Sequence, residues 1–402
     1  MSTPQTQYRA HDDGFNDRLQ GVVRAAAQLP AFAARLEAAG LRSEQLASPR
    51  DLVALPIQTK DEVMEAQLAQ PPFGGMLAGD ADVTRVFQSP GPLYEPQLAG
   101  ADPWRWAVAL RAAGFRAADT VLNCFAYHLS PAGVMFDEAA RAVGARVFPG
   151  GIGSSDLQAR AISDLSITAY TGLPSYLKAL IERFNELGLD RRNWQLERAV
   201  VTAEPLPDSL RAELSRWVPT VLMAYGTAET GLLGYEESPG GGLVVPDDVL
   251  IQVCDLDTGE PVTEGEGQIV VTLLRSEYPL IRFGTGDLSA WVPGGDDRPR
   301  LAGVLGRVGQ AVKVRGMFLH PAQARRVIGA VDGVGAFRMV VDRDGHLDSL
   351  RCEIVTTGSN PDDVIAQVSE RIRQELRFSC HIERVDSIPD DAEVLTDVRD
   401  WS

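Results

Sequence analysis

The spacing of hydrophobic residues changes along the chain, and each change predicts a different kind of structure. From Phe15 to Gly40, apolar residues recur at helical spacing around Pro30, which predicts two short amphipathic helices. From Val83 to Ala224, short apolar or β-branched runs alternate with amphipathic stretches. This alternation is typical of a mainly parallel sheet with helices on its faces and ligands at the carboxyl ends of the strands. Strands are expected at 83–87, 120–125, 145–148, 167–170, 199–202 and 221–224, and helices at 104–114, 131–143, 157–165, 175–187 and 209–217.

Beyond Gly231, turns rich in glycine and proline separate alternating strands, which favours an antiparallel β portion with strands at 249–255, 267–274, 281–283 and 288–292. After Gly306 the order becomes β-β-α-β-β-α-β. The predicted fold class is therefore α/β. A large N-terminal domain, residues 1–305, has mixed, mainly parallel β-sheets flanked by helices plus a β subdomain, and residues 306–402 form a small α+β C-terminal lid domain.

The composition is that of a globular protein with an acidic balance of charge. Of the 402 residues 45% are hydrophobic, and 38 Lys and Arg against 55 Asp and Glu give a formal net charge of -17. This charge argues against nucleic-acid or anionic-membrane partners. The sequence lacks a long apolar run and an apolar signal-peptide core, so we expect a cytoplasmic protein. Its four cysteines and five histidines are scattered, which disfavours disulfides and a His/Cys metal site.

Two segments place candidate binding groups near strand ends. The run from Tyr225 to Glu229 follows an apolar strand, where an aromatic ring, a glycine turn, a hydroxyl and a carboxylate could face a ligand. The alternative is a tyrosine packed in the core and a glutamate in solvent. Asp287 lies in a glycine turn, expected at a strand end and outside the core, where its carboxylate could accept two ribose hydroxyls or cap its own turn.

Positive charge is scarce and is mostly arginine. The chain has three lysines, Lys60, Lys178 and Lys313. Arg307, Lys313 and Arg315 lie close to the predicted domain boundary and suit a phosphate, and solvated charges beside a linker are the alternative. The segment from Val86 to Pro96 has the composition of a loop after a strand.

The order of these segments resembles the adenylate-forming superfamily, most closely phenylacetate-CoA ligases, over nearly the whole chain. The resemblance implies an enzyme that activates a carboxylate with ATP to an acyl-adenylate and, after a lid rotation, passes the acyl group to CoA. Five segments carry it: Leu52 to Asp61, similar to "L..lP.ttK.dl"; Ala203 to Pro205, similar to "GAEP"; Tyr225 to Glu229, similar to "YGxTE"; Arg282 to Asp287, similar to "RYRTxD"; and Gly306 to Pro321, similar to the hinge and lid motif.

The resemblance also implies roles for single residues. It places His128 in the segment that lines the acyl pocket, where a polar contact and a satisfied structural histidine are both open. For the nucleoside, it implies Tyr225 on adenine with Glu204 beside it, Gly226 and Thr227 in the same turn as Tyr225, and Asp287 on the ribose hydroxyls. Arg307 and Lys313 would contact ribose or phosphate. Glu229 would be a catalytic residue that faces the phosphate, or the ligand of Mg²⁺.

Both cations that the family directs at ATP are absent. The phosphate loop, close to SSGTTGKP in the family, reads SPGPLYEP from Ser89 to Pro96, so Glu95 stands at the lysine position. One like-charge pair at about 4 Å costs about 4 kcal/mol at an effective dielectric constant near 20. The lid lysine falls by spacing on Val394, and Gly309 stands at the hinge acid. We therefore expect ATP activation to be impaired or lost while the adenosine contacts remain.

Three hypotheses follow. The first is an enzyme that handles an acyl-CoA or acyl-adenylate of a small carboxylic acid, aromatic acids included, without efficient ATP activation. The second is a fully active ATP-dependent acyl-CoA ligase in which Arg315, Arg399 or Lys313 replaces the lost lysines, and the third is a noncatalytic ligand-binding or partner protein. The expected ligands are a small carboxylate or its CoA thioester, AMP or ATP, and CoA, with Mg²⁺ and a homodimer left open.

Overall fold

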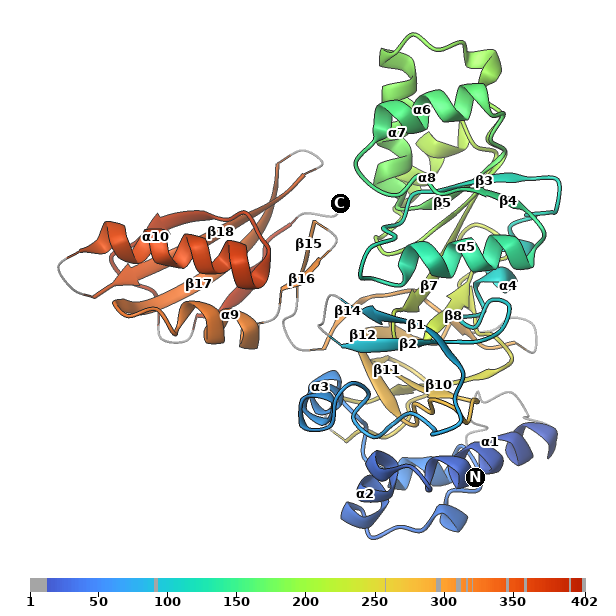
Figure 1. Ribbon diagram of the computed structural model, residues 1–402, viewed down its shortest axis with the longest axis vertical. Helices are drawn as coiled ribbons and strands as arrows, with labels where there is room; N and C mark the ends of the chain where they lie inside the picture. The colour runs from blue at the N-terminus through green and yellow to red at the C-terminus, as the bar shows by residue number, and fades with distance from the viewer. Residues whose placement is uncertain are drawn as a thin grey trace. The chain divides into compact units, whose positions relative to one another are not determined.

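The computed structural model describes residues 13–89, 93–256, 258–293, 298–308, 312–315, 317–319, 321–344, 347–357, 360–389 and 392–399 (Figure 1). The chain divides into two compact units, Met1–Gly306 and Arg307–Ser402. The unit that begins with Met1 contains several sheets, whereas Arg307–Ser402 is organised around one four-stranded sheet.

Helices at the start of the chain pack on one of these sheets. Phe15, Leu19 and Phe32 share a hydrophobic cluster with Leu250. The two helices predicted around Pro30 are confirmed, and Pro30 is the first residue of the second, where its missing N–H is not needed. The elements are α1 (Asp13–Ala26), α2 (Pro30–Ala38), the 3₁₀ helices η1 (Ser43–Gln45) and η2 (Asp51–Ala54), and α3 (Lys60–Ala69).

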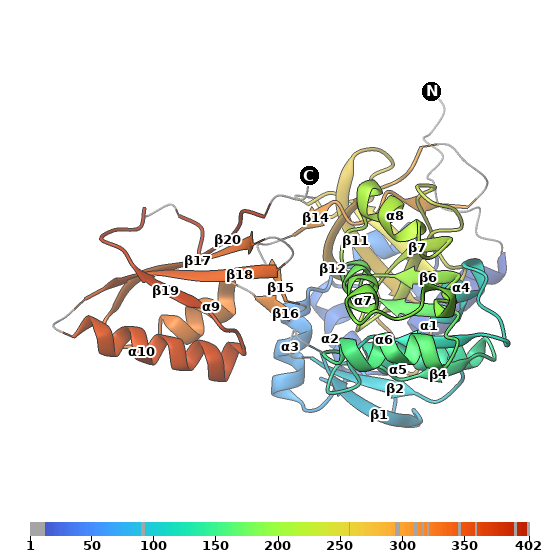
Figure 2. The same ribbon diagram turned by 90° about the horizontal axis from the view of Figure 1, so that it is seen from above.

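The predicted alternation of strands and helices forms an eight-stranded sheet in the order β13-β9-β8-β7-β6-β5-β3-β4. The strands β4, β3, β5, β6 and β7 are parallel, and β8 and β9 continue the sheet antiparallel. Two hydrophobic clusters pack helices against it, one with α4 and α5 and one with α6 and α7 (Figure 2). The elements are α4 (Trp106–Ala112), β3 (Thr120–Asn123), α5 (Ala132–Ala142), β4 (Arg146–Phe148), α6 (Ser155–Asp164), β5 (Ala169–Gly172), α7 (Pro174–Glu186), η3 (Arg191–Asn193), β6 (Arg198–Val201), α8 (Asp208–Ser215), β7 (Thr220–Thr227), β8 (Gly231–Tyr235), β9 (Leu243–Val244) and β13 (Arg300–Leu301).

The predicted β subdomain is an antiparallel sheet built on β10 (Val249–Cys254), β11 (Glu266–Leu273) and β12 (Phe283–Ala290), with β14 (Gly306–Arg307) at its edge. Two predictions here are wrong. The strands expected at 281–283 and 288–292 are one strand, β12, which contains Asp287. The segment expected to be a loop up to Pro96 holds a strand, β2 (Tyr94–Leu98), because it pairs with β1 (Val83–Gln88).

The second unit has a four-stranded sheet in the order β19-β18-β17-β20, with its own hydrophobic cluster, and a two-stranded antiparallel sheet of β15 and β16. Strands β17 and β18 are antiparallel, while β19 and β20 pair with them in parallel. The expected α+β class is observed, and β20 is an addition to the predicted order. The elements are β15 (Val312–Val314), β16 (Met317–Leu319), α9 (Pro321–Ile328), β17 (Val334–Asp344), β18 (Leu347–Thr356), α10 (Pro361–Arg371), the π-helix η4 (Ile372–Leu376), β19 (His381–Arg384) and β20 (Leu395–Asp397).

Candidate functional site

Tyr225 and Asp287, far apart in the sequence, meet inside the first unit. The Tyr225 hydroxyl donates a hydrogen bond of 2.8 Å to Oδ2 of Asp287. Tyr225 is 7% exposed and packs among the hydrophobic residues beneath β7 and β12, as the core interpretation of this segment expected. The expectation that Asp287 lies outside the core is wrong, since it is 4% exposed. Because β12 pairs with β11 on both sides of Asp287, the glycine-containing segment is part of the sheet.

The conformation of the turn after β7 depends on a glycine and two threonines. A Cβ on Gly226 would stand 2.3 Å from the carbonyl oxygen of Gly231 and 2.8 Å from the Trp106 ring, so only glycine fits there. The hydroxyls of Thr227 and Thr230 lie 2.9 Å apart and close the turn. This turn carries Glu229 into the interior.

Glu229 forms an ion pair that was not predicted from the sequence. The Lys60 Nζ lies 3.0 Å from Oε1 of Glu229, with the two side chains 31% and 7% exposed. Burial favours the neutral acid, but the Lys60 ammonium and the Thr227 hydroxyl prevail and hold the pKa of Glu229 below its usual value. The alternative of a solvated Glu229 is therefore wrong. Its Oε2 is buried without a hydrogen-bond partner among the described residues.

Backbone pairing positions Lys60 opposite Glu229. Gln58 forms a parallel bridge with Phe283, in which the Gln58 N–H donates to the Arg282 carbonyl and the Gly284 N–H donates to the Gln58 carbonyl, each at 2.8 Å. Thr59 then begins α3 with a capping box to Glu62, which makes Lys60 the first helical residue. The T-x-x-E capping signature was the available sequence signal for this helix start.

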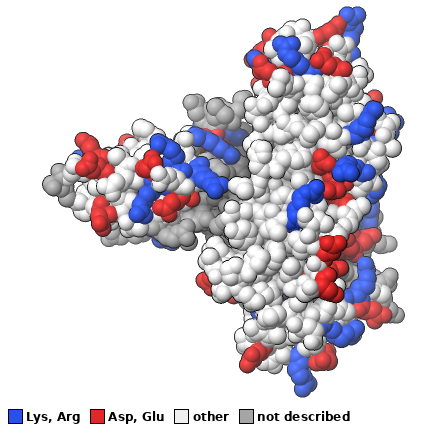
Figure 3. Space-filling view, viewed as in Figure 1, with Lys and Arg blue, Asp and Glu red and all other residues white. Residues whose placement is uncertain are grey.

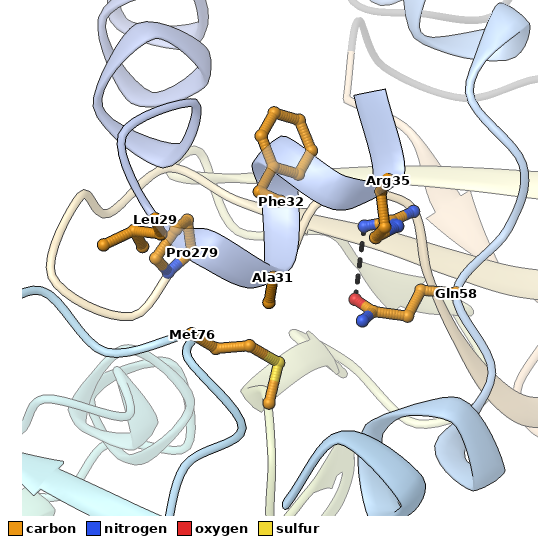
Figure 4. A pocket seen from close by; sticks show the side chains of 7 residues that line it. All are labelled: Leu29, Ala31, Phe32, Arg35, Gln58, Met76 and Pro279. Atoms are coloured by element: carbon orange, nitrogen blue, oxygen red, sulfur yellow. Dashed lines mark hydrogen bonds between the residues drawn. The ribbon is translucent and has the colours of Figure 1, made fainter. Parts of the chain in front are cut away.

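Arg35 holds the same segment from the other side (Figure 4). Its guanidinium donates to the Gln58 side chain at 3.2 Å and to the carbonyls of Ile281 and Pro56 at 2.9 Å. Burial lowers the pKa of Arg35 to about 10. The small pocket drawn there is otherwise lined by Leu29, Ala31, Phe32, Met76 and Pro279. Because its one cationic group already has three acceptors, we assign this pocket a role in packing.

Glu95, at the position of the family's loop lysine, is buried in β2 at 3% exposure. Burial raises the pKa of Glu95 well above its usual value, Glu229 raises it further, and Arg275 and Lys60 oppose the rise. Oε1 of Glu95 has no hydrogen-bond partner among the described residues. Pro90, Gly91 and Pro92 of the same loop lie outside the described residues.

The other predicted groups of the first unit lie beyond strand ends. Glu204 follows β6 and accepts a 2.5 Å hydrogen bond from the Ser175 hydroxyl. His128 is exposed in the segment between β3 and α5. Beside it, the Tyr127 hydroxyl donates to Asp137 at 3.0 Å and accepts from the Asn123 amide at 2.8 Å. This polar network lies where the acyl pocket was expected.

In the second unit, Arg307 is exposed in β14. Lys313 lies in β15, and its side chain is outside the described residues. Two arginines considered as substitutes for the missing lysines already have partners in their own unit. Arg315 donates through N–H and Nε to Asp348, at 3.0 and 2.9 Å, and Arg399 pairs with the same aspartate at 3.1 Å. The lysine position, Val394, is partly buried against the hydrophobic cluster.

Comparison with known proteins confirms the resemblance read from the sequence. No family model matches the chain. It is 28% identical over 355 residues to the phenylacetate-coenzyme A ligase of Aromatoleum evansii, which covers 84% of this chain and 80% of that protein. It is 29% identical over 343 residues to the Escherichia coli K12 protein of the same name, covering 81% and 78%.

Solved structures show the same fold. A crystal structure of 2-hydroxyisobutyryl-CoA ligase in complex with 2-HIB-AMP and CoA matches with a TM-score of 0.86 at 24% identity, over 99% of this chain and 94% of that one. The amide bond synthetase McbA from Marinactinospora thermotolerans matches with a TM-score of 0.57 at 15% identity, over 93% and 96%. The fold is therefore that of the adenylate-forming acyl-CoA ligases.

Two observations concern the expected partners: the distribution of surface charge, and the length and hydrophobicity of the helices. On the face in Figure 3, basic and acidic side chains alternate along the edge of the first unit. Within the described residues, no helix combines the length and hydrophobicity needed to cross a membrane.

Proposed function

We propose that this protein is an acyl-CoA ligase-like enzyme that activates a small carboxylic acid with ATP and transfers the acyl group to CoA. One observation carries the proposal: the Lys60 ammonium lies 3.0 Å from Glu229, in a turn directly after the strand that brings Tyr225 to Asp287. The sequence lacked a cation for the phosphates at either family position. Lys60, which belongs to the segment similar to "L..lP.ttK.dl", would supply one from a third position.

The nucleotide would be held by residues on β7 and β12. Asp287 is oriented by Tyr225 for the ribose hydroxyls, and a rigid buried donor keeps its carboxylate in place. Tyr225 would offer an edge rather than an open face to adenine, since it is packed in the core. Glu204, Gly226 and Thr227 would complete this side of the nucleotide site, and Arg307 and Lys313 of the second unit are proposed for ribose or phosphate.

Lys60 and Glu229 would act at the phosphates. The partly exposed ammonium of Lys60 can turn from Glu229 to a phosphate oxygen and stabilise the charge that develops there. Glu229 has the chemistry of a divalent-cation ligand, because its Oε2 is a buried carboxylate oxygen without a hydrogen-bond partner among the described residues. Mg²⁺ bound there would neutralise phosphate charge.

The comparisons support the substrate class. Relatives named phenylacetate-coenzyme A ligase cover four-fifths of the chain, and the similar 2-hydroxyisobutyryl-CoA ligase was solved with 2-HIB-AMP and CoA. Both names describe small carboxylic acids that become CoA thioesters. In this chain the network of Tyr127, Asn123 and Asp137, with the exposed His128, is the candidate wall of the acid pocket.

A second candidate is favoured by a different observation. Glu95 replaces the loop lysine and Val394 the lid lysine, so the enzyme could act on a preformed acyl-adenylate or acyl-CoA with ATP activation impaired or lost. We rank it second because Glu95 is buried in β2, not displayed as a free anion.

Two assays separate these candidates. Acid-dependent ATP-pyrophosphate exchange over a panel of small aromatic and aliphatic acids measures activation, and CoA thioester formation from synthetic acyl-adenylates measures transfer alone. Exchange together with transfer supports the first candidate, and transfer without exchange supports the second. Absence of both with every acid contradicts an acyl-CoA ligase-like enzyme.

A further inference from the structure

The turn that carries Glu229 packs against the residues directly before α4. Glu229 lies between β7 and β8, and the next residue, Thr230, is fully buried. The Leu232 N–H donates to the Trp104 carbonyl at 3.0 Å. A Cβ on Gly231 would stand 2.5 Å from the same carbonyl oxygen, so the two backbones are in close contact. The position of the turn therefore depends on the segment that begins α4.

Arg105, the residue before α4, directs its side chain to this turn. Its Nη2 donates hydrogen bonds to the carbonyls of Thr230 and Leu232, the second at 3.2 Å. Its Nε lies 3.4 Å from Oδ1 of Asp248, and the two side chains are 13% and 48% exposed. A guanidinium is planar and holds its N–H groups in fixed directions, whereas the ammonium of a lysine is a compact point charge. Arg105 can therefore hold both carbonyls at once.

The backbone before α4 has a conformation that side chains rarely adopt. Asp102 and Arg105 have φ angles of 55° and 67°, in the left-handed region, and neither is a glycine. The Asp102 carboxylate accepts hydrogen bonds from the N–H groups of Trp106 and Ala107, at 3.0 and 2.6 Å. Such conformations persist only where the surrounding contacts impose them, and they cluster at functional sites. The contacts of Arg105 with the turn are a reason for this one.

Arg105 acts on Glu229 through the adjacent residue. The Thr230 N–H donates to the Thr227 hydroxyl at 3.2 Å, and the Thr230 carbonyl accepts from Arg105. These bonds fix the backbone on both sides of Thr230. Because the Glu229 carboxylate reaches Lys60 at 3.0 Å, a small displacement of this backbone would separate the two charges.

We propose that Arg105 is a positioning residue: by holding the carbonyls of Thr230 and Leu232, it directs the Glu229 carboxylate to Lys60. Its importance for activity rests on the proposed function, in which Lys60 and Glu229 act at the phosphates of ATP. Without Arg105 the turn keeps its Thr227 bond and its contact with Trp104, but it loses two side-chain bonds beside Glu229.

The chain has only three lysines, so the surroundings of Lys60 can be measured without turnover. The full chain is produced with lysine isotopically labelled at Cε, and Lys60→Met assigns the Lys60 signal in a proton–carbon correlation spectrum. Glu229→Gln gives the signal of Lys60 without its carboxylate partner. We expect Arg105→Met and Arg105→Lys to move the Lys60 signal more than halfway to that position, because neither side chain can hold both carbonyls. The Lys178 signal should stay in place.

Arg211 supplies a matched control. It is also 13% exposed, pairs with the buried Glu236 at 2.8 Å and donates to the Val221 carbonyl near the start of β7 at 2.7 Å. Arg211→Lys should leave the Lys60 signal in place and change the kcat of ATP-pyrophosphate exchange less than twofold. Arg105→Lys should lower this kcat at least tenfold and change the KM for the acid less than twofold, because it disturbs Glu229 and Lys60 and not the acid pocket.

The outcomes separate positioning from general destabilisation. An unmoved Lys60 signal in both Arg105 variants, equal movement in Arg105→Lys and Arg211→Lys, or a moved signal with wild-type exchange kinetics overturns the proposal. Movement in Arg105→Met that Arg105→Lys restores assigns the effect to charge alone and also overturns it. If Arg105→Met does not fold, Arg105→Lys carries the test. If the wild type shows no exchange with any acid, a moved signal upholds the positioning role and contradicts the ATP-dependent function alone.

Discussion

Replacing Lys60 by methionine removes the ammonium that pairs with Glu229 while keeping a long, flexible side chain. The ammonium and the Oε1 of Glu229 are 3.0 Å apart. At an effective dielectric constant near 20, the attraction at this distance is about 5.5 kcal/mol. Ordering a lysine side chain costs up to about 2 kcal/mol, and water reaches the 31% of Lys60 that is exposed. We therefore expect the variant to lose about 2 kcal/mol of unfolding free energy.

The assay is urea and thermal unfolding of the full chain at neutral pH, compared with Lys178→Met as a matched control. Lys178 also forms a lysine-glutamate pair, 3.1 Å from Glu213, but that glutamate is 46% exposed. Pairs of this kind contribute about 0.2–1 kcal/mol. At an unfolding entropy of about 2.1 cal/mol/K per residue, a loss of about 2 kcal/mol corresponds to roughly 3 °C in melting temperature for a unit of this size. Equal losses in the two variants would refute the claim that Glu229 depends on Lys60.

Three further predictions concern the surroundings of the site. Tyr225→Phe deletes the 2.8 Å hydrogen bond to Asp287, so we expect a loss of about 1–3 kcal/mol in unfolding free energy. We also expect weaker AMP binding by calorimetry, and unchanged AMP affinity would contradict the ribose role of Asp287. Thr59→Ala removes the cap that starts α3 at Lys60 and should cost about 1 kcal/mol, whereas Thr59→Ser should restore the stability in chemical unfolding. Burial raises the pKa of Asp102, whose carboxylate accepts hydrogen bonds from the first turn of α4, to about 6. Because this pKa is higher than that of the unfolded chain, the associated stability is present at acidic pH and is lost as pH rises through about 6. The melting temperature of Asp102→Asn should therefore rise relative to that of the wild type between pH 5 and pH 7, and parallel pH profiles of the two proteins would contradict this.

The periodicity of the sequence was sufficient to predict the parallel part of the sheet. Strands such as β3, β5 and β6 are short and almost wholly buried, and amphipathic helices separate them, so local sequence and burial agree. The strand β2 could not be predicted this way. Glu95 and Pro96 within it have poor strand propensity, and pairing with β1 determines their conformation.

The candidate site was predictable in part. The types of residue at Tyr225, Glu229 and Asp287 indicated a ligand site, but no local pattern could show that the tyrosine hydroxyl donates to the aspartate. The place of Lys60 depends on the bridge between Gln58 and Phe283, which joins segments at opposite ends of the first unit's sequence. Contacts between segments so far apart in the sequence follow from tertiary packing, so the sequence could not show that Lys60 pairs with Glu229.

The most direct test of the central claim is to incubate the protein with ATP, Mg²⁺, CoA and a panel of small carboxylic acids, and to quantify acyl-CoA and AMP by mass spectrometry. The account predicts that at least one acid gives acyl-CoA and AMP in equal amounts, and that Lys60→Met lowers the rate at least tenfold while Lys178→Met does not. Acyl-CoA and AMP formed by Lys60→Met at the wild-type rate, or no acyl-CoA from any acid, would contradict it.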